Sequence, residues 1–181
     1  MSRIGRKHID IPAGVEVKFE DGVVTVKGKN GELKQAIKCS DINVKIDGGV
    51  INVERANEQK QTRAYHGLYR QLIADMVSGV VTPFTKTLIV AGVGYKCAVT
   101  GNKLVMNIGY SKPVEYVIPE GITITCPDPL TIVVSGISKE HVGEVAAQIK
   151  SKRPVEPYHG YGLHYSTEVV LRKEAKTAGK K

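Results

Sequence analysis

Several features that mark common protein classes are missing from this chain of 181 residues. No apolar run approaches the roughly 18 residues that a membrane-spanning helix needs. The first eight residues do not lead into the apolar core of a signal peptide, because Asp10 and Pro12 interrupt it at once. We therefore expect neither a membrane span nor a secretory leader.

Cysteine is scarce, and its spacing supports neither a disulfide framework nor a CxxC site. The chain has three cysteines, an odd number, at long intervals: Cys39, Cys97 and Cys126. We expect reduced thiols in a cytoplasmic protein.

Catalytic and cofactor-binding motifs are also missing. The lone Gly92-Val93-Gly94 does not begin a dinucleotide-binding fingerprint, because the third glycine would fall at Cys97. His159 and His164 have no cysteine or second carboxylate at metal-ligand spacing. The sequence predicts no metal, no cofactor, no small-molecule substrate and no enzyme. An active site assembled in space from distant residues stays an alternative.

Positive charge gathers at the two ends of the chain. The net charge is +8, from 26 basic and 18 acidic residues. Residues 1–8 carry three basic residues and no acidic one, residues 9–149 carry 15 of each, and residues 150–181 carry eight basic and three acidic residues. A neutral body with basic ends predicts a polyanionic partner. Neither end shows the apolar face of an interfacial helix, so we expect no membrane partner.

Alternating apolar and polar residues predict strands over most of the chain. In the first half they cover residues 15–19, 23–27, 32–38, 42–46 and 50–54. In the second half they cover residues 84–91, 95–100, 103–109, 115–118, 122–126 and 130–135.

Each half also contains one predicted amphipathic helix. The first runs from a cap at Asn57 to about Gly79. Its predicted buried stripe is widened by Tyr65 and Ile73 and recurs at every fourth residue: Ala64, Leu68, Leu72 and Met76. The second runs from Ser138 and stops before Pro154, with four buried residues: Val142, Val145, Ala146 and Ile149.

Two distant segments of the chain resemble each other. Ile11–Val17 matches Ile118–Ile124, and Val24–Gly28 matches Ile132–Gly136. In both segments a Pro-x-Gly turn leads into strand-like alternation. The match favours two similar small domains, in which these segments are equivalent, and a chance match of so short a pattern is the alternative.

The predicted fold class is α+β. It comprises two similar domains from an internal duplication, each an antiparallel sheet packed with one helix. We expect an N-terminal domain of residues 1–82 and a C-terminal domain of residues 83–181 with a basic tail.

An aromatic and glycine-rich segment follows the second helix. Three of the eight tyrosines lie between Tyr158 and Tyr165, interleaved with Gly160 and Gly162. Tyr and His rings stack on unpaired bases, and glycine lets a backbone approach a partner closely. The segment predicts RNA binding, and packing of its tyrosines on their own domain is the alternative.

Seven short stretches occur along the whole chain in the order and at the spacing of one family: Met1–Gly5, Ile11–Val15, Val26–Gly28, Gly92–Lys96, Asn107–Ser111, Val142–Ala147 and Glu174–Lys176. On these stretches the chain resembles the bacterial-type large-subunit ribosomal protein L6 family. The resemblance implies a structural role in translation, on the large ribosomal subunit. It also implies binding to 23S-type ribosomal RNA near the base of the stalk where translation factors dock, beside neighbouring large-subunit proteins. It implies no catalytic residues.

The chain departs from the family pattern in its C-terminal segment. His159 and Tyr161 stand where lysines are usual, and His164 and Leu171 stand where basic residues are usual. Neutral or pH-dependent side chains thus replace fixed charges. We expect these four positions to contribute less electrostatic affinity, with stacking by Tyr161 replacing part of it.

The candidate RNA-binding residues form three patches. The main patch lies in the second domain and its tail: Lys152, Arg153, Tyr158, His159, Gly160, Gly162, Arg172, Lys173, Lys176 and Lys180. A second lies on loops of the second sheet: Lys96, Tyr110, Ser111 and Lys112. A third lies at the N-terminus: Arg3, Arg6 and Lys7. A non-ribosomal protein–protein adaptor with incidental basic tails is the alternative from another class.

Overall fold

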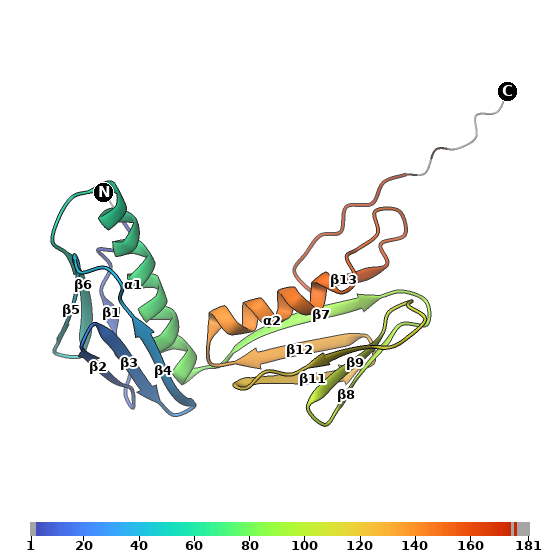
Figure 1. Ribbon diagram of the computed structural model, residues 1–181, viewed down its shortest axis with the longest axis horizontal. Helices are drawn as coiled ribbons and strands as arrows, with labels where there is room; N and C mark the ends of the chain where they lie inside the picture. Colours follow the sequence, from blue (N-terminus) through green and yellow to red (C-terminus); the bar gives the residue numbers. More distant parts are fainter. Residues whose placement is uncertain (1–2, 175, 177–181) are drawn as a thin grey trace. The chain divides into compact units, whose positions relative to one another are not determined.

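The computed structural model describes residues 3–174 and residue 176 (Figure 1). They divide into two compact units. Unit 1 runs to Phe84 and includes Ile137–Lys139, and unit 2 comprises Thr85–Gly136 and the described residues from Glu140 onward. Each unit combines antiparallel strands with one helix, which confirms the predicted α+β class with two similar halves. A division into separately folding domains at residues 82 and 83 stays a prediction.

Unit 1 contains two three-stranded antiparallel sheets and one helix. The first sheet contains, in spatial order, β2 (Glu16–Glu20), β3 (Val23–Gly28) and β4 (Gly31–Ala36). The second contains β1 (Ile9–Asp10), β6 (Val50–Arg55) and β5 (Ile42–Asp47). The helix α1 (Lys60–Val81) packs on β3, β4 and β6. Apolar side chains from both sheets and from α1 share one core.

Unit 2 has the same plan with one strand more. One sheet contains, in spatial order, β10 (Val114–Val117), β9 (Lys103–Asn107) and β8 (Lys96–Thr100). The other contains β11 (Ile122–Asp128), β12 (Thr131–Gly136), β7 (Phe84–Ala91) and β13 (Gly162–Tyr165). The helix α2 (Lys139–Ser151) lies along this second sheet (Figure 1) and buries the predicted side: Val142, Val145, Ala146 and Ile149.

The two units repeat one topology, but the equivalent strands differ from the predicted ones. The sheet order β1-β6-β5 reappears as β7-β12-β11, and β2-β3-β4 reappears as β8-β9-β10. The equivalent strands β2 and β8 begin at Glu16 and Lys96, and β5 and β11 begin at Ile42 and Ile122, so both pairs are separated by the same interval. The predicted equivalence of β2 and β3 with β11 and β12 is wrong. It arose because any hairpin entered through a Pro-x-Gly turn shows the same alternation.

The buried face of α1 differs from the predicted stripe. Ala64 and Leu68 are exposed, although the sequence placed them in the core. A stripe of every fourth residue drifts around a helix of 3.6 residues per turn. The true face also includes the polar Thr62 and His66, which a search for apolar residues passes over. It consists of Thr62, His66, Tyr69, Ile73, Met76, Val77, Gly79 and Val80.

α1 continues past Gly79, where the sequence predicted its end. Asn30 in the turn between β3 and β4 satisfies the last carbonyl groups. Its backbone N–H donates to the oxygen of Val80 (3.2 Å), and its Nδ2 donates to the oxygen of Val81 (2.9 Å). The helix begins at Lys60 rather than directly after the predicted cap. A distant turn therefore allows the extra helical residues.

Two strands, β1 and β13, were not predicted from the sequence, whereas the bounds of the other strands lie close to the predicted ones. The three cysteines are free thiols. Among the described residues, no helix combines the length and the apolar character that crossing a membrane requires.

Candidate RNA-binding surface

The segment after α2 folds back onto the sheet of unit 2. The backbone N–H of Leu163 donates to the carbonyl oxygen of Arg153 (2.9 Å) where the chain returns. Residues Gly162–Tyr165 then form β13, antiparallel to β7. The C-terminal part of the predicted RNA-binding segment is therefore a strand of the sheet.

Between Arg153 and β13 the chain makes a compact loop that presents aromatic rings. The N–H of Glu156 donates to the carbonyl oxygen of Tyr161 (2.8 Å) and closes the loop. The His159 ring stacks on the Tyr161 ring, with centroids 5.3 Å and planes 18° apart. His159 Nδ1 also lies 3.2 Å from the Glu156 carboxylate. Tyr158 and His159 are exposed, so their rings are available for stacking on bases.

Gly160 and Gly162 serve contacts within the chain. Both are buried and have positive φ angles of 76° and 142°. A Cβ at Gly162 would lie 2.7 Å from the carbonyl oxygen of Pro154, and a Cβ at Gly160 would lie 2.8 Å from Nε of Arg172. The sequence attributed these glycines to close approach of an RNA backbone. The structure explains both of them by internal packing.

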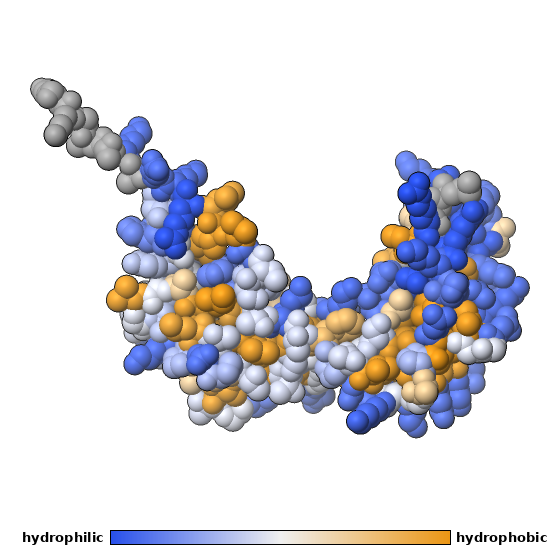
Figure 2. Space-filling model, turned by 180° about the vertical axis from the view of Figure 1, so that it is seen from behind, coloured by the Kyte–Doolittle hydropathy of each residue, from blue (hydrophilic) through white to orange (hydrophobic). Residues whose placement is uncertain are grey.

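The first residues of the basic tail are held against this loop. The backbone N–H of Lys173 donates to the carbonyl oxygen of Pro157 (2.7 Å), and the Arg172 guanidinium lies against Gly160. Lys176 is exposed, and Lys180 lies outside the described residues. Figure 2 shows hydrophilic residues gathered along the described tail (blue, upper left).

Tyr110 joins two of the predicted patches. It lies beyond β9, and its hydroxyl donates to the carbonyl oxygen of Lys152 at the end of α2 (3.0 Å). The Arg153 guanidinium lies over the Tyr110 ring, 5.0 Å from its centroid. The hydrogen bond with Tyr110, together with the nearby Tyr95, raises the pKa of Arg153. Arginine is protonated throughout the physiological pH range, so this side chain is a cation supported by an aromatic ring.

Tyr95 belongs to this cluster, although it was not among the predicted site residues. Its ring fills the space beside two glycines: a Cβ at Gly92 would lie 2.5 Å from the ring, and one at Gly109 would lie 2.8 Å from the hydroxyl oxygen. The motifs Gly92–Lys96 and Asn107–Ser111 thus meet around one ring. Both motifs contain Gly and Tyr, and this shared composition was the sequence feature that could have identified Tyr95 as a site residue.

The rest of the second patch surrounds this cluster in the chain. Lys96 begins β8 directly after Tyr95, and Ser111 and Lys112 follow Tyr110. All three are exposed. The main and second patches therefore meet where Arg153 lies over Tyr110. We give the name Tyr110–Arg153 surface to this contact and the residues beside it in the chain: Tyr95, Lys96, Tyr110, Ser111, Lys112, Lys152 and Arg153.

Comparison with known proteins shows where this architecture belongs. A family model described as Ribosomal protein L6 matches residues 11–82 and 91–166, two segments whose starting points are separated by the same interval as the repeated strands. Large ribosomal subunit protein uL6 of Mesoplasma florum is 50% identical over 99% of this chain and 100% of its own length. The protein of the same name from Listeria monocytogenes is 49% identical over 98% and 99% of the two chains.

The chain belongs to the ribosomal protein L6 family. Members of this family are structural proteins of the large ribosomal subunit and take part in translation in the cytoplasm, and they are not enzymes. The predicted family and the predicted non-enzymatic class are confirmed. Within residues 3–174 and 176, no three His, Cys, Asp or Glu side chains come together as a metal site requires.

Lys150 serves internal contacts of this L6-family protein. Its Nζ lies 2.6 Å from the Glu168 carboxylate and 4.9 Å from the centroid of the Tyr165 ring. The hydrogen bond from Lys150, helped by the backbone N–H of Tyr165, lowers the pKa of Glu168. This ion pair ties α2 to the chain beyond β13.

The third predicted patch belongs to unit 1, whereas the Tyr110–Arg153 surface belongs to unit 2. Arg3, Arg6 and Lys7 are exposed. The carbonyl oxygen of Lys7 accepts a hydrogen bond from Nε of Arg70 (3.1 Å), so this basic segment is fixed to α1.

Proposed function

We propose that this L6-family protein binds 23S-type ribosomal RNA chiefly through unit 2, near the base of the stalk where translation factors dock. The observation that carries the proposal is the support of Arg153 by Tyr110. A guanidinium whose orientation is already fixed loses less conformational entropy when it meets a phosphate.

Charge and ring exposure support the same proposal. Residues 150–181 carry eight basic and three acidic residues, whereas residues 9–149 are neutral. Cations that neutralise phosphates release counterions, and exposed rings stack on unpaired bases. The residues proposed for phosphate are Lys96, Lys112, Lys152, Arg153, Arg172, Lys173, Lys176 and Lys180, with Arg3 and Lys7 in unit 1. The residues proposed for bases and hydroxyl groups are Tyr110, Ser111, Tyr158 and His159.

The stalk-base location and contacts with neighbouring large-subunit proteins are part of the proposal, and they follow from the family resemblance. Chemical cross-linking of intact large subunits tests both. We expect cross-links from exposed lysines of unit 2 to proteins at the stalk base, and cross-links elsewhere would contradict the location.

Filter binding of the full chain to large-subunit RNA fragments tests the RNA contact. Lys152→Gln with Arg153→Gln should weaken binding roughly tenfold or more, at about 1 kcal/mol for each contact. The matched control is Lys18→Gln with Lys103→Gln, which removes two exposed charges outside the proposed surface. A protein–protein adaptor would show no RNA binding in any variant.

We also propose that residues 1–82 and 83–181 fold as separate domains. Thermal melting of the two fragments, compared with the full chain, tests this division. A cooperative transition in each fragment is expected, and an unfolded fragment would contradict it.

A further inference from the structure

The N-terminal basic segment of unit 1, residues 3–8, is fixed on α1. The Arg70 guanidinium donates to the carbonyl oxygens of Lys7 and His8, each at 3.1 Å. The backbone at Gly5 packs closely against the His66 ring, since a Cβ there would be 2.4 Å from Nδ1. A larger residue would clash with the ring, so glycine allows the segment to pack on α1 here.

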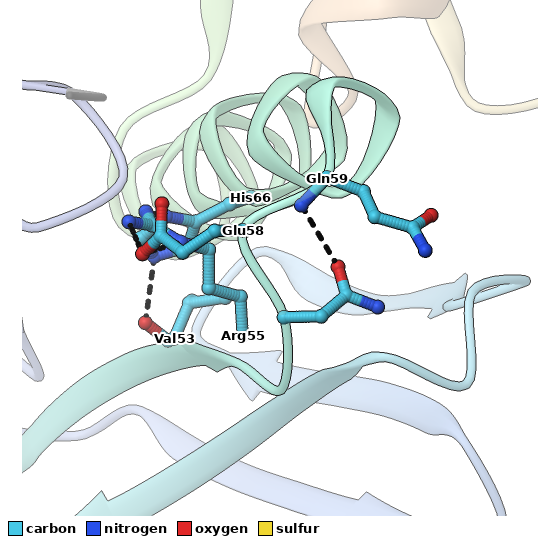
Figure 3. Close-up of polar contacts among 6 residues, drawn as sticks. Val53, Arg55, Glu58, Gln59 and His66 are labelled. Carbon is cyan, nitrogen blue, oxygen red and sulfur yellow. Dashed lines mark hydrogen bonds and ion pairs between the residues drawn. The ribbon is translucent and has the colours of Figure 1, made fainter.

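His66, which packs against Gly5, has a hydrogen-bond partner at each ring nitrogen (Figure 3). His66 is buried, with 4% of its surface exposed, and its Nε2 lies 2.8 Å from the carbonyl oxygen of Val53. Nη1 of Arg55 lies 3.0 Å from Nδ1. A carbonyl oxygen only accepts and a guanidinium only donates, so Nε2 carries the proton and Nδ1 accepts. Arg55 also pairs with Glu58, which precedes α1.

Positive charge is concentrated at this end of unit 1. The basic residues of the segment, of the end of β6 and of the first half of α1 are Arg3, Arg6, Lys7, Arg55, Lys60, Arg63 and Arg70. The first turn of α1 contains no acidic residue. The acidic residues nearby are Glu58, Glu54 at the end of β6, which pairs with Lys45, Asp10 beside His8, and Asp41 beside Asn57 and Thr62. A count over residues 9–149 hides this local excess.

The charges of Arg6, in the N-terminal segment, and of Arg63, on α1, both act on the Glu58 carboxylate. Hydrogen bonding to Arg55 lowers the pKa of Glu58, and the charges of Arg63 and Arg6 lower it further. Arg55 and Arg70 are occupied by hydrogen bonds within unit 1. Among the described residues, no hydrogen bond joins the guanidinium of Arg6 or Arg63 to another group, and both residues are exposed. These two cations remain available to a partner.

We propose that Arg6 and Arg63 form a second RNA-binding surface, on unit 1, that takes backbone phosphates of ribosomal RNA separately from the Tyr110–Arg153 surface. This inference rests on the proposed function, because it names a second contact for the same ligand. Guanidinium groups bind phosphate oxygens through two parallel hydrogen bonds. The contacts with His66 and Arg70 already fix the N-terminal segment before RNA binds, which lowers the conformational entropy lost on binding.

The test is filter binding of the full chain to large-subunit RNA over a range of salt concentrations. Arg6→Gln with Arg63→Gln should weaken binding roughly tenfold or more and lower the log–log salt slope by about one to two. The matched control is Lys18→Gln with Lys34→Gln, which removes two exposed charges from β2 and β4 and should change affinity less than about twofold. An equal loss in both variants would overturn the proposal, because only net charge would then matter.

A second variant tests the surface in the opposite direction. Glu58→Gln removes a carboxylate that attracts both arginines and should tighten binding several-fold, while Glu32→Gln on β4 should leave it unchanged. Weaker binding by Glu58→Gln would overturn the proposal, and so would displacement of RNA from Arg6 and Arg63 by a poly-glutamate peptide at equimolar charge.

Failure of the unsubstituted chain to bind RNA would overturn the proposed function itself, whereas normal binding by the double arginine variant would overturn this inference only.

Discussion

The guanidinium of Arg153 lies over the ring of Tyr110, 5.0 Å from its centroid, although Tyr110 follows β9 and Arg153 follows α2. Tyr110 also donates a hydrogen bond to the carbonyl oxygen of Lys152. The end of α2 and the chain beyond β9 therefore support each other at the proposed RNA-binding surface.

Substitution of Tyr110 should separate the roles of its ring and its hydroxyl. Tyr110→Ala removes the support of Arg153, and we expect a loss of RNA affinity of roughly two- to fivefold, since a cation–ring contact at an exposed site is worth about 0.5–1 kcal/mol. Tyr110→Phe keeps the ring and should retain most of the affinity. Filter binding measures both. Equal affinity of the alanine variant and the unsubstituted chain would show that Arg153 needs no support.

Lysines at positions 159 and 161 should strengthen RNA binding. His159→Lys with Tyr161→Lys adds two fixed cations and should steepen the log–log salt dependence by up to about two. The gain at position 159 should be partial, because Glu156 lies beside that side chain. Adding Glu156→Gln should release the remainder. Binding that stays constant in both variants would mean that this loop does not face phosphate.

Glycine at position 162 should be essential for stability. Gly162→Ala places a Cβ 2.7 Å from the backbone of Pro154 at a φ angle of 142° and should destabilise the protein by about 2–4 kcal/mol. Gly143→Ala in α2 is the matched control, since its Cβ would meet no atom within 4 Å, and it should stabilise by about 0.5–1 kcal/mol. Urea unfolding measures both. A neutral Gly162→Ala would contradict the packing described for β13.

The Lys150–Glu168 pair should stabilise the protein only when Glu168 is ionised. Its pKa is lowered from 4.5 in the folded protein, so its contribution is present above pH 4.5 and is lost as the pH falls through the lower folded value. Glu168→Gln should therefore reduce the melting temperature at pH 7, with the difference vanishing in acid. Glu120→Gln, at an exposed position, is the control. A difference that persists below the folded pKa of Glu168 would mean that packing, not charge, is lost.

A feature of the fold could be predicted from the sequence when it depends on neighbouring residues. It was missed when it depends on residues far away in the chain. Alternation predicted most strands close to their true bounds, because it reflects local burial on one face. The end of α1 was missed because Asn30 caps its last carbonyl groups from a turn far back in the sequence. β13 was missed because a short strand containing Gly162 has little local signal and forms only against β7.

The candidate surface shows the same limit. Composition predicted its basic and aromatic residues, but the sequence placed Tyr110 and Arg153 in separate patches, and only the folded chain brings them together. Gly160 and Gly162 were predicted to let an RNA backbone approach closely. A glycine in the sequence does not show whether a partner or the chain itself approaches its backbone. The polar Thr62 and His66 were left out of the core because their hydrogen bonds with distant residues cannot be deduced from periodicity.

The pairing of β7 with β13 also determines when unit 2 can be completed during synthesis. β7 ends at Ala91, and its partner begins at Gly162. At about 5–20 residues per second, a ribosome needs roughly 4–14 seconds to make the intervening chain. Throughout that interval one edge of β7 has unpaired backbone groups and is open to strands of other chains. Nascent chains that stall between these two strands should therefore need chaperone protection.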